Sequence, residues 1–411
     1  MAFEPLKGVK IIVGISGGIA AYKSVEVIRT LVKDGAEVTP IMTKNALRFI
    51  GDVTVSALSS HKVLSSLYDS DESIPHTASA RECDAVVVVP ATARIIGSYA
   101  NGIPSDLLSA TLIASKSKVV LCPAMHEEMW TNRAVVENVE KLRGYGVKVI
   151  EPDSGLLAGG DIGMGRLPDP SAICDYVERE ILKSSSIANL NVVVTAGGTR
   201  EPIDPVRFIS NRSSGKQGFE IAKAFWLKGA NVTLIATFDT PELDGFRVVK
   251  VETADEMAEA TIKFSGSTDV FVMTAAVADF KAKEVFQKKL KRKDKMSTLD
   301  LAPTTDILAE LVAQRDIHNA KSENVLHEEQ ILIGFAAETG DLESMALEKL
   351  KTKNVDVIVA NDVSKPGVGF SYDTNSVLIL TKHGNRIELP LMSKKEIAFN
   401  LVKIVEEMVE R

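Results

Sequence analysis

The sequence is poor in cysteine, in excess positive charge and in long apolar runs. Its three cysteines, Cys83, Cys122 and Cys174, are widely spaced, so they predict neither a disulfide framework nor a zinc site built from thiolates. Aspartate and glutamate number 55 against 48 lysines and arginines, and the net charge of −7 argues against a protein that coats nucleic acid. Apolar runs such as Ala85–Val89 are far too short to span a bilayer.

The N-terminal segment also lacks the layout of a signal peptide. We therefore expect a cytoplasmic protein with neither a membrane nor a nucleic-acid partner. What is present is ordinary for a folded chain: 45% of the 411 residues are apolar and 25% are charged. At roughly 100–200 residues per domain, this length predicts two or three domains.

The two halves of the chain begin alike. In each of Val9–Thr43 and Leu190–Thr237, an apolar run leads through a glycine-bearing turn into a segment with helical periodicity, and a second apolar run follows. This is the pattern of a βαβ unit. Gly35 and Gly229 precede the second runs, where the C-terminus of a helix favours a left-handed residue.

Further apolar segments predict two α/β domains with mostly parallel sheets, covered on both faces. Ser376–Leu389 predicts a closing hairpin with its turn at His383–Asn385, and the serine-rich segment Leu182–Asn191 predicts a linker. We place the domains at residues 1–186 and 187–411. The additional buried strands are expected at Ala85–Thr92, Lys118–Met125, Val147–Pro152, Asp269–Phe280, Ile331–Thr339 and Val355–Val363.

Two glycine-rich turns, Gly14–Ala20 and Thr195–Glu201, are suited to hold a phosphate with backbone N–H groups. Neither turn matches a P-loop or a GxGxxG pattern. An NAD site favours an acidic residue after the second strand, whereas this sequence has Thr43 and Lys44. A hydroxyl and a cation favour a mononucleotide such as FMN, and a purely structural role for the glycines stays open.

A basic cluster lies in the second half. Glu284 and Asp294 are its only acidic residues, and a solvated loop and a loop that closes on a triphosphate both explain it. A nucleic-acid arm is a poorer interpretation, because Lys288–Lys295 contains no aromatic residue. The cluster consists of Lys281, Lys283, Lys288, Lys289, Lys291, Arg292, Lys293 and Lys295.

Over essentially its whole length the sequence resembles the bifunctional proteins of coenzyme A biosynthesis. These join phosphopantothenoylcysteine decarboxylase to phosphopantothenate–cysteine ligase. Among the matching strings, TREPIDPVRFISNRSSGKQG is long and highly specific. The strings occur in the order of the family: GISGGIAAYK, PATAR, NGIPSDLLS, PAMHEEMW, SGLLAGGDIGMGRL, TAGGTREPIDPVRFISNRSSGKQG, TAAVADF, GFAAET and ANDVS.

For the first half the resemblance implies the flavodoxin-like fold of the FMN-dependent cysteine decarboxylases. His76 matches the catalytic histidine and is suited to proton transfer near neutral pH. Flavin oxidation of the substrate thiol to a thioaldehyde permits loss of carbon dioxide, and the resulting enethiol then needs a hydride and a proton. The residues implied at FMN are Ser16, Gly17, Gly18 and Thr43 around the phosphate, and Ala91, Thr92 and the turn of Ser105, Asp106, Leu107 and Leu108 along the ring and ribityl chain.

The first half departs from the family pattern at two positions. His126 replaces an asparagine that holds the substrate carboxylate, and its imidazole can still donate a hydrogen bond. Gly159 replaces a cysteine that acts as the acid in the final reduction, and glycine cannot donate a proton. Asp161 or water is then the candidate acid. Cys174 lies in a segment of helical pattern, where we expect a small buried residue.

For the second half the resemblance implies a ligase that activates the phosphopantothenate carboxylate with CTP and a divalent cation, usually Mg²⁺. Asn211 matches the asparagine that turns over the acyl-nucleotide, and Lys289 matches the first lysine of the family's KxK motif. Arg207, Arg212 and Lys216 lie in the same specific segment and are candidates for the substrate phosphate. The residues implied at the nucleotide are Met273, Thr274, Ala275, Asp279, Lys289, Thr305, Asp306, Ile307, Leu308, Phe335, Lys349 and Lys353.

Two other functions stay open for the first half: a non-catalytic or impaired flavoprotein domain beside an active ligase, and another flavin chemistry such as prenyl transfer. The resemblance also implies a homo-oligomer, a trimer or dodecamer through the first domain and a dimer through the second. The sequence does not identify the metal ligands.

Overall fold

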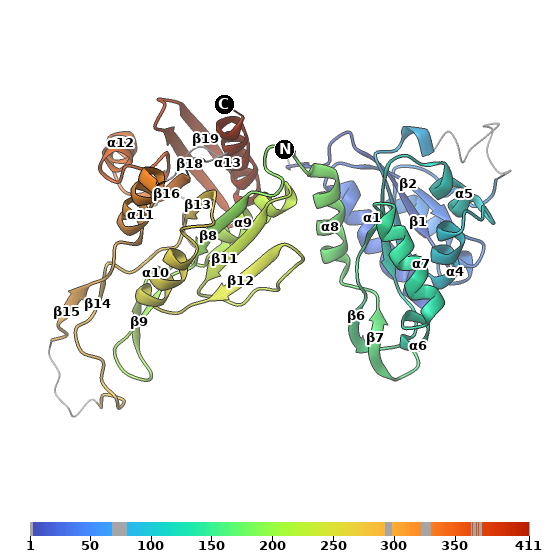
Figure 1. Cartoon of the computed structure of the whole chain (residues 1–411), viewed down its shortest axis with the longest axis horizontal. Helices are drawn as coiled ribbons and strands as arrows, with labels where there is room; N and C mark the ends of the chain where they lie inside the picture. Colours follow the sequence, from blue (N-terminus) through green and yellow to red (C-terminus); the bar gives the residue numbers. More distant parts are fainter. Residues whose placement is uncertain are drawn as a thin grey trace. The chain divides into compact units, whose positions relative to one another are not determined.

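The computed structural model describes residues 3–67, 80–291, 298–321, 330–362, 364, 367, 369 and 372–410. Its chain divides into two compact units, Met1–Leu182 and Lys183–Arg411 (Figure 1). His76 and the part of the basic cluster at 292–297 lie outside the described residues.

The first unit is built on a five-stranded parallel sheet in the order β2-β1-β3-β4-β5. This order is the one of flavodoxin-like folds. All seven residues of β3 are buried, as expected for a parallel sheet that is covered on both faces. The predicted fold class is thus confirmed for this half. The strands are β1 (Lys10–Ile15), β2 (Glu37–Met42), β3 (Ala85–Ala91), β4 (Lys118–Pro123) and β5 (Lys148–Val149).

Alternate residues of the strands enter two different cores. Ile11, Val13 and Ile15 of β1 pack with α1 (Ser24–Lys33) and α8 (Pro170–Leu182). Ile12 packs on the opposite face with α4 (Ala93–Ala100), α5 (Leu107–Ala114) and α7 (Arg133–Gly144). The period of two along a strand therefore places helices on both faces. Shorter elements are η1 (Ile19–Lys23), η2 (Ala46–Arg48), α2 (Asp52–Leu58), α6 (Glu127–Trp130), β6 (Asp153–Leu156) and β7 (Ile162–Arg166).

The second unit contains an eight-stranded sheet in the order β12-β11-β8-β13-β16-β17-β18-β19. The first six strands in that order run parallel and the last two form an antiparallel hairpin, which confirms the predicted closing hairpin. The strands are β12 (Phe246–Lys250), β11 (Asn231–Ala236), β8 (Asn191–Ala196), β13 (Val270–Met273), β16 (Ile331–Glu338), β17 (Val357–Asp362), β18 (Thr374–Thr381) and β19 (Arg386–Ser393).

Helices and two small ladders complete this unit (Figure 1). The ladders pair β9 (Arg200–Pro202) with β10 (Phe208–Ser210), and β14 (Phe280–Ala282) with β15 (Leu301–Pro303). The helices are α9 (Lys216–Leu227), α10 (Ala254–Lys263), α11 (Ile307–Lys321), α12 (Leu342–Thr352) and α13 (Lys394–Val409).

One expectation about the second half was wrong. The strand expected over Asp269–Phe280 ends at Met273. The chain leaves the sheet there because Ala275 N–H donates to the side chain of Thr195, at the end of β8, over 3.3 Å to Oγ1. The boundary between the two units lies at the start of the expected linker, and the linker residues themselves are packed. Ile187 is fully buried and Ser184 N–H donates to Lys228 O over 3.0 Å, so this segment packs on the second unit.

Gly35 and Gly229 have φ angles of +96° and +105°, which confirms the left-handed positions expected after α1 and α9. Across the described ranges, no helix has the length and apolar character needed to cross a membrane.

Candidate functional sites

The first unit gathers its candidate site at the carboxyl edge of the sheet. Ser16, Thr43 and Thr92 directly follow β1, β2 and β3, which are neighbours in a parallel sheet. His126 comes three residues after β4. Ligands of open α/β sheets bind at this edge, so the topology brings together residues that are far apart in sequence.

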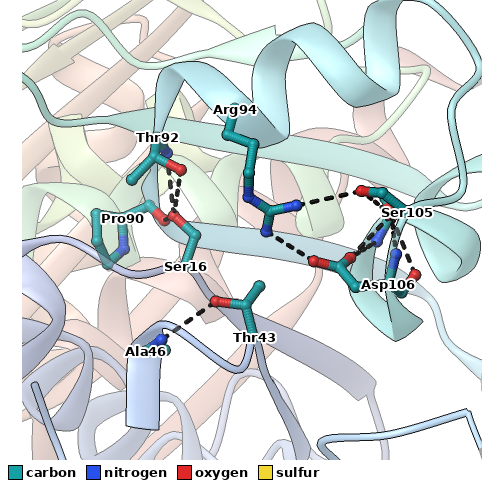
Figure 2. A network of polar contacts seen from close by, with 9 residues as sticks. Ser16, Thr43, Ala46, Pro90, Thr92, Arg94, Ser105 and Asp106 are labelled. Carbon is teal, nitrogen blue, oxygen red and sulfur yellow. Dashed lines mark hydrogen bonds and ion pairs between the residues drawn. The ribbon is translucent and has the colours of Figure 1, made fainter. Parts of the chain in front are cut away.

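Ser16 fastens the ends of β1 and β3 to each other. Its fully buried Oγ donates to Pro90 O over 2.7 Å and accepts from Thr92 N–H over 3.0 Å. It also lies 3.0 Å from Thr92 Oγ1 (Figure 2). The hydroxyl proton of Ser16 is thus engaged inside the protein, and the spacing between the two loops is fixed.

The glycines after Ser16 have different surroundings. A Cβ at Gly17 would lie 2.8 Å from the carbonyl carbon of Asn45, so the two loops approach too closely for a side chain. A Cβ at Gly18 would meet only Thr92 Cγ2, at 3.5 Å. Gly18 therefore leaves an open cradle at the start of η1, and a phosphate of a flavin mononucleotide fits this kind of space.

Thr43 borders the loop that Gly17 contacts. It is 3% exposed, and its Oγ1 accepts from Ala46 N–H over 3.3 Å (Figure 2). Within the described residues no acceptor takes its hydroxyl proton, which leaves Thr43 able to donate to a phosphate oxygen.

Arg94 is a residue that sequence reasoning missed, although it ends the PATAR string. Its guanidinium donates to Asp106 Oδ2 over 2.6 Å and to Ser105 Oγ over 3.2 Å (Figure 2). Burial raises the pKa of Asp106, but hydrogen bonds from Ser109 and Arg94 outweigh it, and the net pKa is lowered. Asp106 is thus an anion held by α4 and α5.

The expected turn at Ser105–Leu108 is instead the start of a helix. Asp106 forms a capping box with Ser109, and α5 begins at Leu107. Leu107 and Leu108 are 2% and 1% exposed in the core, and Ala91 is fully buried. Their side chains therefore face the interior, which leaves the backbone to contact a cofactor.

Replacement of Asp106 by alanine is expected to destabilise the first unit by about 1 kcal/mol at neutral pH, because a helix cap is lost. A carboxyl with a lowered folded-state pKa stabilises the fold above its unfolded pKa, and this contribution disappears as the pH falls through the folded pKa. The difference between parent and variant should therefore shrink in acid. Urea unfolding at several pH values measures it, and Asp106→Asn, which keeps the cap, should lose less at neutral pH.

The hairpin of β6 and β7 carries the second departure from the family pattern. Met125 N–H donates to Gly165 O over 3.0 Å, which holds the hairpin beside α6. At Gly159 a Cβ would lie 2.9 Å from His126 Cε1 and 3.2 Å from Asp161 Oδ2. Cys174, by contrast, is 2% exposed in the core between α1 and α8, as expected, and burial raises the pKa of its thiol.

In the second unit, the loops after β8 and β13 hold Asn211 between them. Asn211 Nδ2 donates to Ala276 O, and its Oδ1 accepts from Ser213 N–H over 3.1 Å. A Cβ at Gly198 would collide with Asn211 Oδ1. The amide is therefore fixed at the carboxyl edge of the sheet, beside Thr274 and the rest of the 274–276 loop.

The segment that carries Lys289 is fastened to the loop after β9. Asp204, which sequence reasoning missed, accepts from Leu290 N–H over 3.1 Å, and Arg207 donates to Leu290 O over 3.0 Å. Asp204 is 3% exposed. The N–H and the carbonyl group of Leu290, the residue after Lys289, are thus both hydrogen-bonded, while the Lys289 side chain itself is exposed. In the same basic cluster, Lys281 forms an ion pair with Asp255.

The other residues expected at the nucleotide form a second group. Thr304 Oγ1 donates to Ala278 O over 2.6 Å and Thr304 N–H donates to Asp279 O over 3.0 Å, so the 274–280 and 304–308 segments adjoin. Lys353 pairs with Asp306. Burial raises the pKa of Asp306, but hydrogen bonds from Lys353 and from the backbone outweigh it, and the net pKa is lowered.

Several expected contacts are already engaged within the protein. Lys349 pairs with Glu338 over 2.5 Å and Lys216 pairs with Asp373 over 2.6 Å. Met273 and Ile307 lie in the core, whereas Phe335 is half-buried and Thr305 is partly exposed. Arg212 is exposed. Among the residues that the structure describes, no three of His, Cys, Asp and Glu gather as a metal site would require.

Comparisons with known proteins cover both units. The family described as Flavoprotein matches residues 3–182, and the DNA/pantothenate metabolism flavoprotein C-terminal domain matches residues 187–409. The coenzyme A biosynthesis bifunctional protein CoaBC of Bacillus subtilis is 42% identical over 95% of this chain and 94% of its own length. That of Escherichia coli K12 is 38% identical over 99% of this chain and 98% of its own.

A solved structure is also similar to the second half. The crystal structure of the C-terminal domain of CoaBC is 38% identical, covers 55% of this chain and 99% of its own, and has a TM-score of 0.44.

Proposed function

Because the chain belongs to the family of coenzyme A biosynthesis bifunctional proteins, we propose that its two units catalyse successive steps from 4′-phosphopantothenate to 4′-phosphopantetheine. The chain is a bifunctional enzyme that combines a ligase with a decarboxylase. The observation that carries this assignment is the pair of family matches, which together cover residues 3–182 and 187–409. We assign decarboxylation to residues 1–186 and ligation to residues 187–411.

In the first unit, Gly17, Gly18 and Thr43 hold the phosphate of FMN, and Ser16 and Thr92 keep the two loops at the required spacing. The open cradle at Gly18 supports this assignment. When bound, FMN supplies two-electron chemistry, removing a hydride from the substrate and returning it. His76 moves a proton, and His126 donates a hydrogen bond to the substrate carboxylate. The backbone of Ala91, Ser105, Asp106, Leu107 and Leu108 borders the rest of the cofactor.

In the second unit, Asn211 polarises the acyl carbonyl of the nucleotide intermediate while the cysteine amine attacks. The fixed amide supports this role, since one N–H bonds Ala276 O and the described part of the chain offers no acceptor to the other. Lys289 neutralises charge on the triphosphate, with Arg207, Arg212 and Lys216 near the substrate phosphate. The proposed CTP contacts come from Met273, Thr274, Ala275, Asp279, Thr305, Asp306, Ile307, Leu308, Phe335, Lys349 and Lys353.

Magnesium would enter this site with the triphosphate. It is typically held by one or two carboxylates together with substrate phosphates. We further propose a homo-oligomer, a trimer or dodecamer through the first domain and a dimer through the second. The relatives provide no support for the alternative of an impaired flavoprotein domain.

Two half-assays test this assignment. The purified protein should show a flavin spectrum, and the flavin released from it should be FMN. Supplied with 4′-phosphopantothenate, cysteine and Mg²⁺, it should release pyrophosphate with CTP more efficiently than with ATP. A colourless protein that takes up no FMN would refute the first half, and a lack of pyrophosphate release with any nucleotide would refute the second.

A further inference from the structure

His126, Gly159 and Asp161 converge at the tip of the β6–β7 hairpin. The position of a Cβ at Gly159 lies 2.9 Å from His126 Cε1, 3.7 Å from His126 Nδ1 and 3.2 Å from Asp161 Oδ2. The imidazole and the carboxylate therefore flank one point in space, and a side chain at position 159 would compete with the imidazole for it. The residues at 126 and 159 are thus structurally coupled.

Backbone contacts fix this convergence. Gly165 has a φ of +141° and a Cβ there would collide with Met125 O, while a Cβ at Gly163 would collide with the Glu127 carboxylate. The lack of a side chain at these two glycines permits the close approach, and the hydrogen bond from Met125 N–H to Gly165 O holds β7 beside the residue that precedes His126. Helix α6 lies beside β7 (Figure 1).

The same segment reaches the proposed flavin cradle. Ala124 N–H donates to Ala91 O over 3.3 Å. The residue after Ala91, Thr92, donates its N–H to Ser16 Oγ. His126 is two residues beyond Ala124. The segment that carries His126 is thus connected by hydrogen bonds to the loops that border the cradle.

Both side chains are available for chemistry. His126 and Asp161 are exposed, and no described residue hydrogen-bonds the imidazole or the Asp161 carboxylate. An exposed imidazole that no structural contact occupies can approach a bound substrate and donate a proton to it.

We propose that His126 is the acid of the reductive step. This inference rests on the proposed function. It extends the role of His126: the imidazole first donates a hydrogen bond to the substrate carboxylate, and it becomes free when that carboxylate leaves as carbon dioxide.

The step balances without a further reactant. Decarboxylation leaves an enethiolate, whose carbon–carbon π pair takes the proton from His126 and forms a C–H bond. The product of this protonation is a thioaldehyde. FMN, if held at the Gly18 cradle, would supply the hydride that converts the thioaldehyde carbon to the thiolate of 4′-phosphopantetheine. Neutral His126 regains a proton from solvent.

The first test uses His126→Asn in the holoenzyme with 4′-phosphopantothenoylcysteine. Asparagine keeps a hydrogen-bond donor for the carboxylate but cannot supply a proton. In a single turnover, with enzyme in excess over substrate, we expect carbon dioxide release within a few-fold of the parent, whereas formation of 4′-phosphopantetheine falls about 10²–10⁴-fold. Mass spectrometry should then detect the enethiol as the product. The double variant His126→Asn/Gly159→Cys should recover the reduction, because a thiol then occupies the same point. His61→Asn, an exposed histidine of the same unit, is the matched control.

Undiminished 4′-phosphopantetheine formation by His126→Asn would overturn the proposal, and so would an equal loss of carbon dioxide release and reduction. Either result leaves the proposed function intact, because that function is tested by the parent enzyme alone.

A second readout needs no flavin. In FMN-free protein with Gly159→Cys, a nearby imidazole should lower the thiol pKa and accelerate alkylation by iodoacetamide at neutral pH. The alkylation rate of the parent protein, which reports its own cysteines, is subtracted first. We expect the remaining rate to fall about tenfold when His126→Gln is combined with Gly159→Cys. Equal rates would show that the imidazole does not share this point, and the proposal would fail.

Discussion

Ligation by the Asn211→Asp variant is expected to be at least about 10²-fold slower than by the parent, which is the usual cost of losing one donor to a developing oxyanion. Asn211 Nδ2 donates to Ala276 O in the structure. A carboxylate at this position has no N–H group and would also repel both the Ala276 carbonyl and the anionic acyl-nucleotide. The acyl-nucleotide should accumulate, because its formation does not need the amide.

Pyrophosphate release and ligated product, measured in the same samples, separate the two stages. Asn385→Asp is the matched control, since Asn385 is exposed in the turn between β18 and β19. Decarboxylation of added 4′-phosphopantothenoylcysteine by the Asn211→Asp protein should stay at the parental rate. A ligation rate equal to that of the control variant would remove Asn211 from the mechanism.

A methyl group at Gly18 is expected to weaken FMN binding by at least about tenfold without destabilising the flavin-free protein. The Cβ of this residue would have ordinary van der Waals contact with Thr92 Cγ2, at 3.5 Å. Its methyl group would fill the open cradle that we assign to the phosphate. Fluorescence titration of the flavin-free protein with FMN measures the affinity, and urea unfolding without FMN measures the stability.

Gly17→Ala, unlike Gly18→Ala, should destabilise the flavin-free protein. Its Cβ would lie 2.8 Å from the carbonyl carbon of Asn45, so the flavin-free protein should lose about 1–3 kcal/mol of stability, as overpacked sites do. If Gly18→Ala binds FMN as tightly as the parent, the phosphate lies elsewhere.

The fold was largely predictable because its signals are local. The continuous apolar runs of β1 and β3, the glycines after α1 and α9 and the turn at His383–Asn385 are all visible as short patterns. The end of β13 was not predictable in this way. The chain leaves the sheet there because Thr195, far away in sequence, provides the hydrogen-bond acceptor for Ala275 N–H.

The sites were predictable as residue types but not as arrangements. No sequence spacing shows that Asp204 holds the peptide next to Lys289, or that Lys349 and Lys353 are paired with carboxylates. The departures at 126 and 159 look independent in the sequence. Only the docking of β7 beside α6 shows that they share one point in space.

The most direct test of one chain that catalyses both steps is the mass of the product formed from 4′-phosphopantothenate, cysteine, CTP and Mg²⁺ by the FMN-loaded protein. We predict 4′-phosphopantetheine as the end product, with 4′-phosphopantothenoylcysteine only as a transient. A reaction that stops at 4′-phosphopantothenoylcysteine, with FMN bound, would contradict the account and show that the first unit does not decarboxylate.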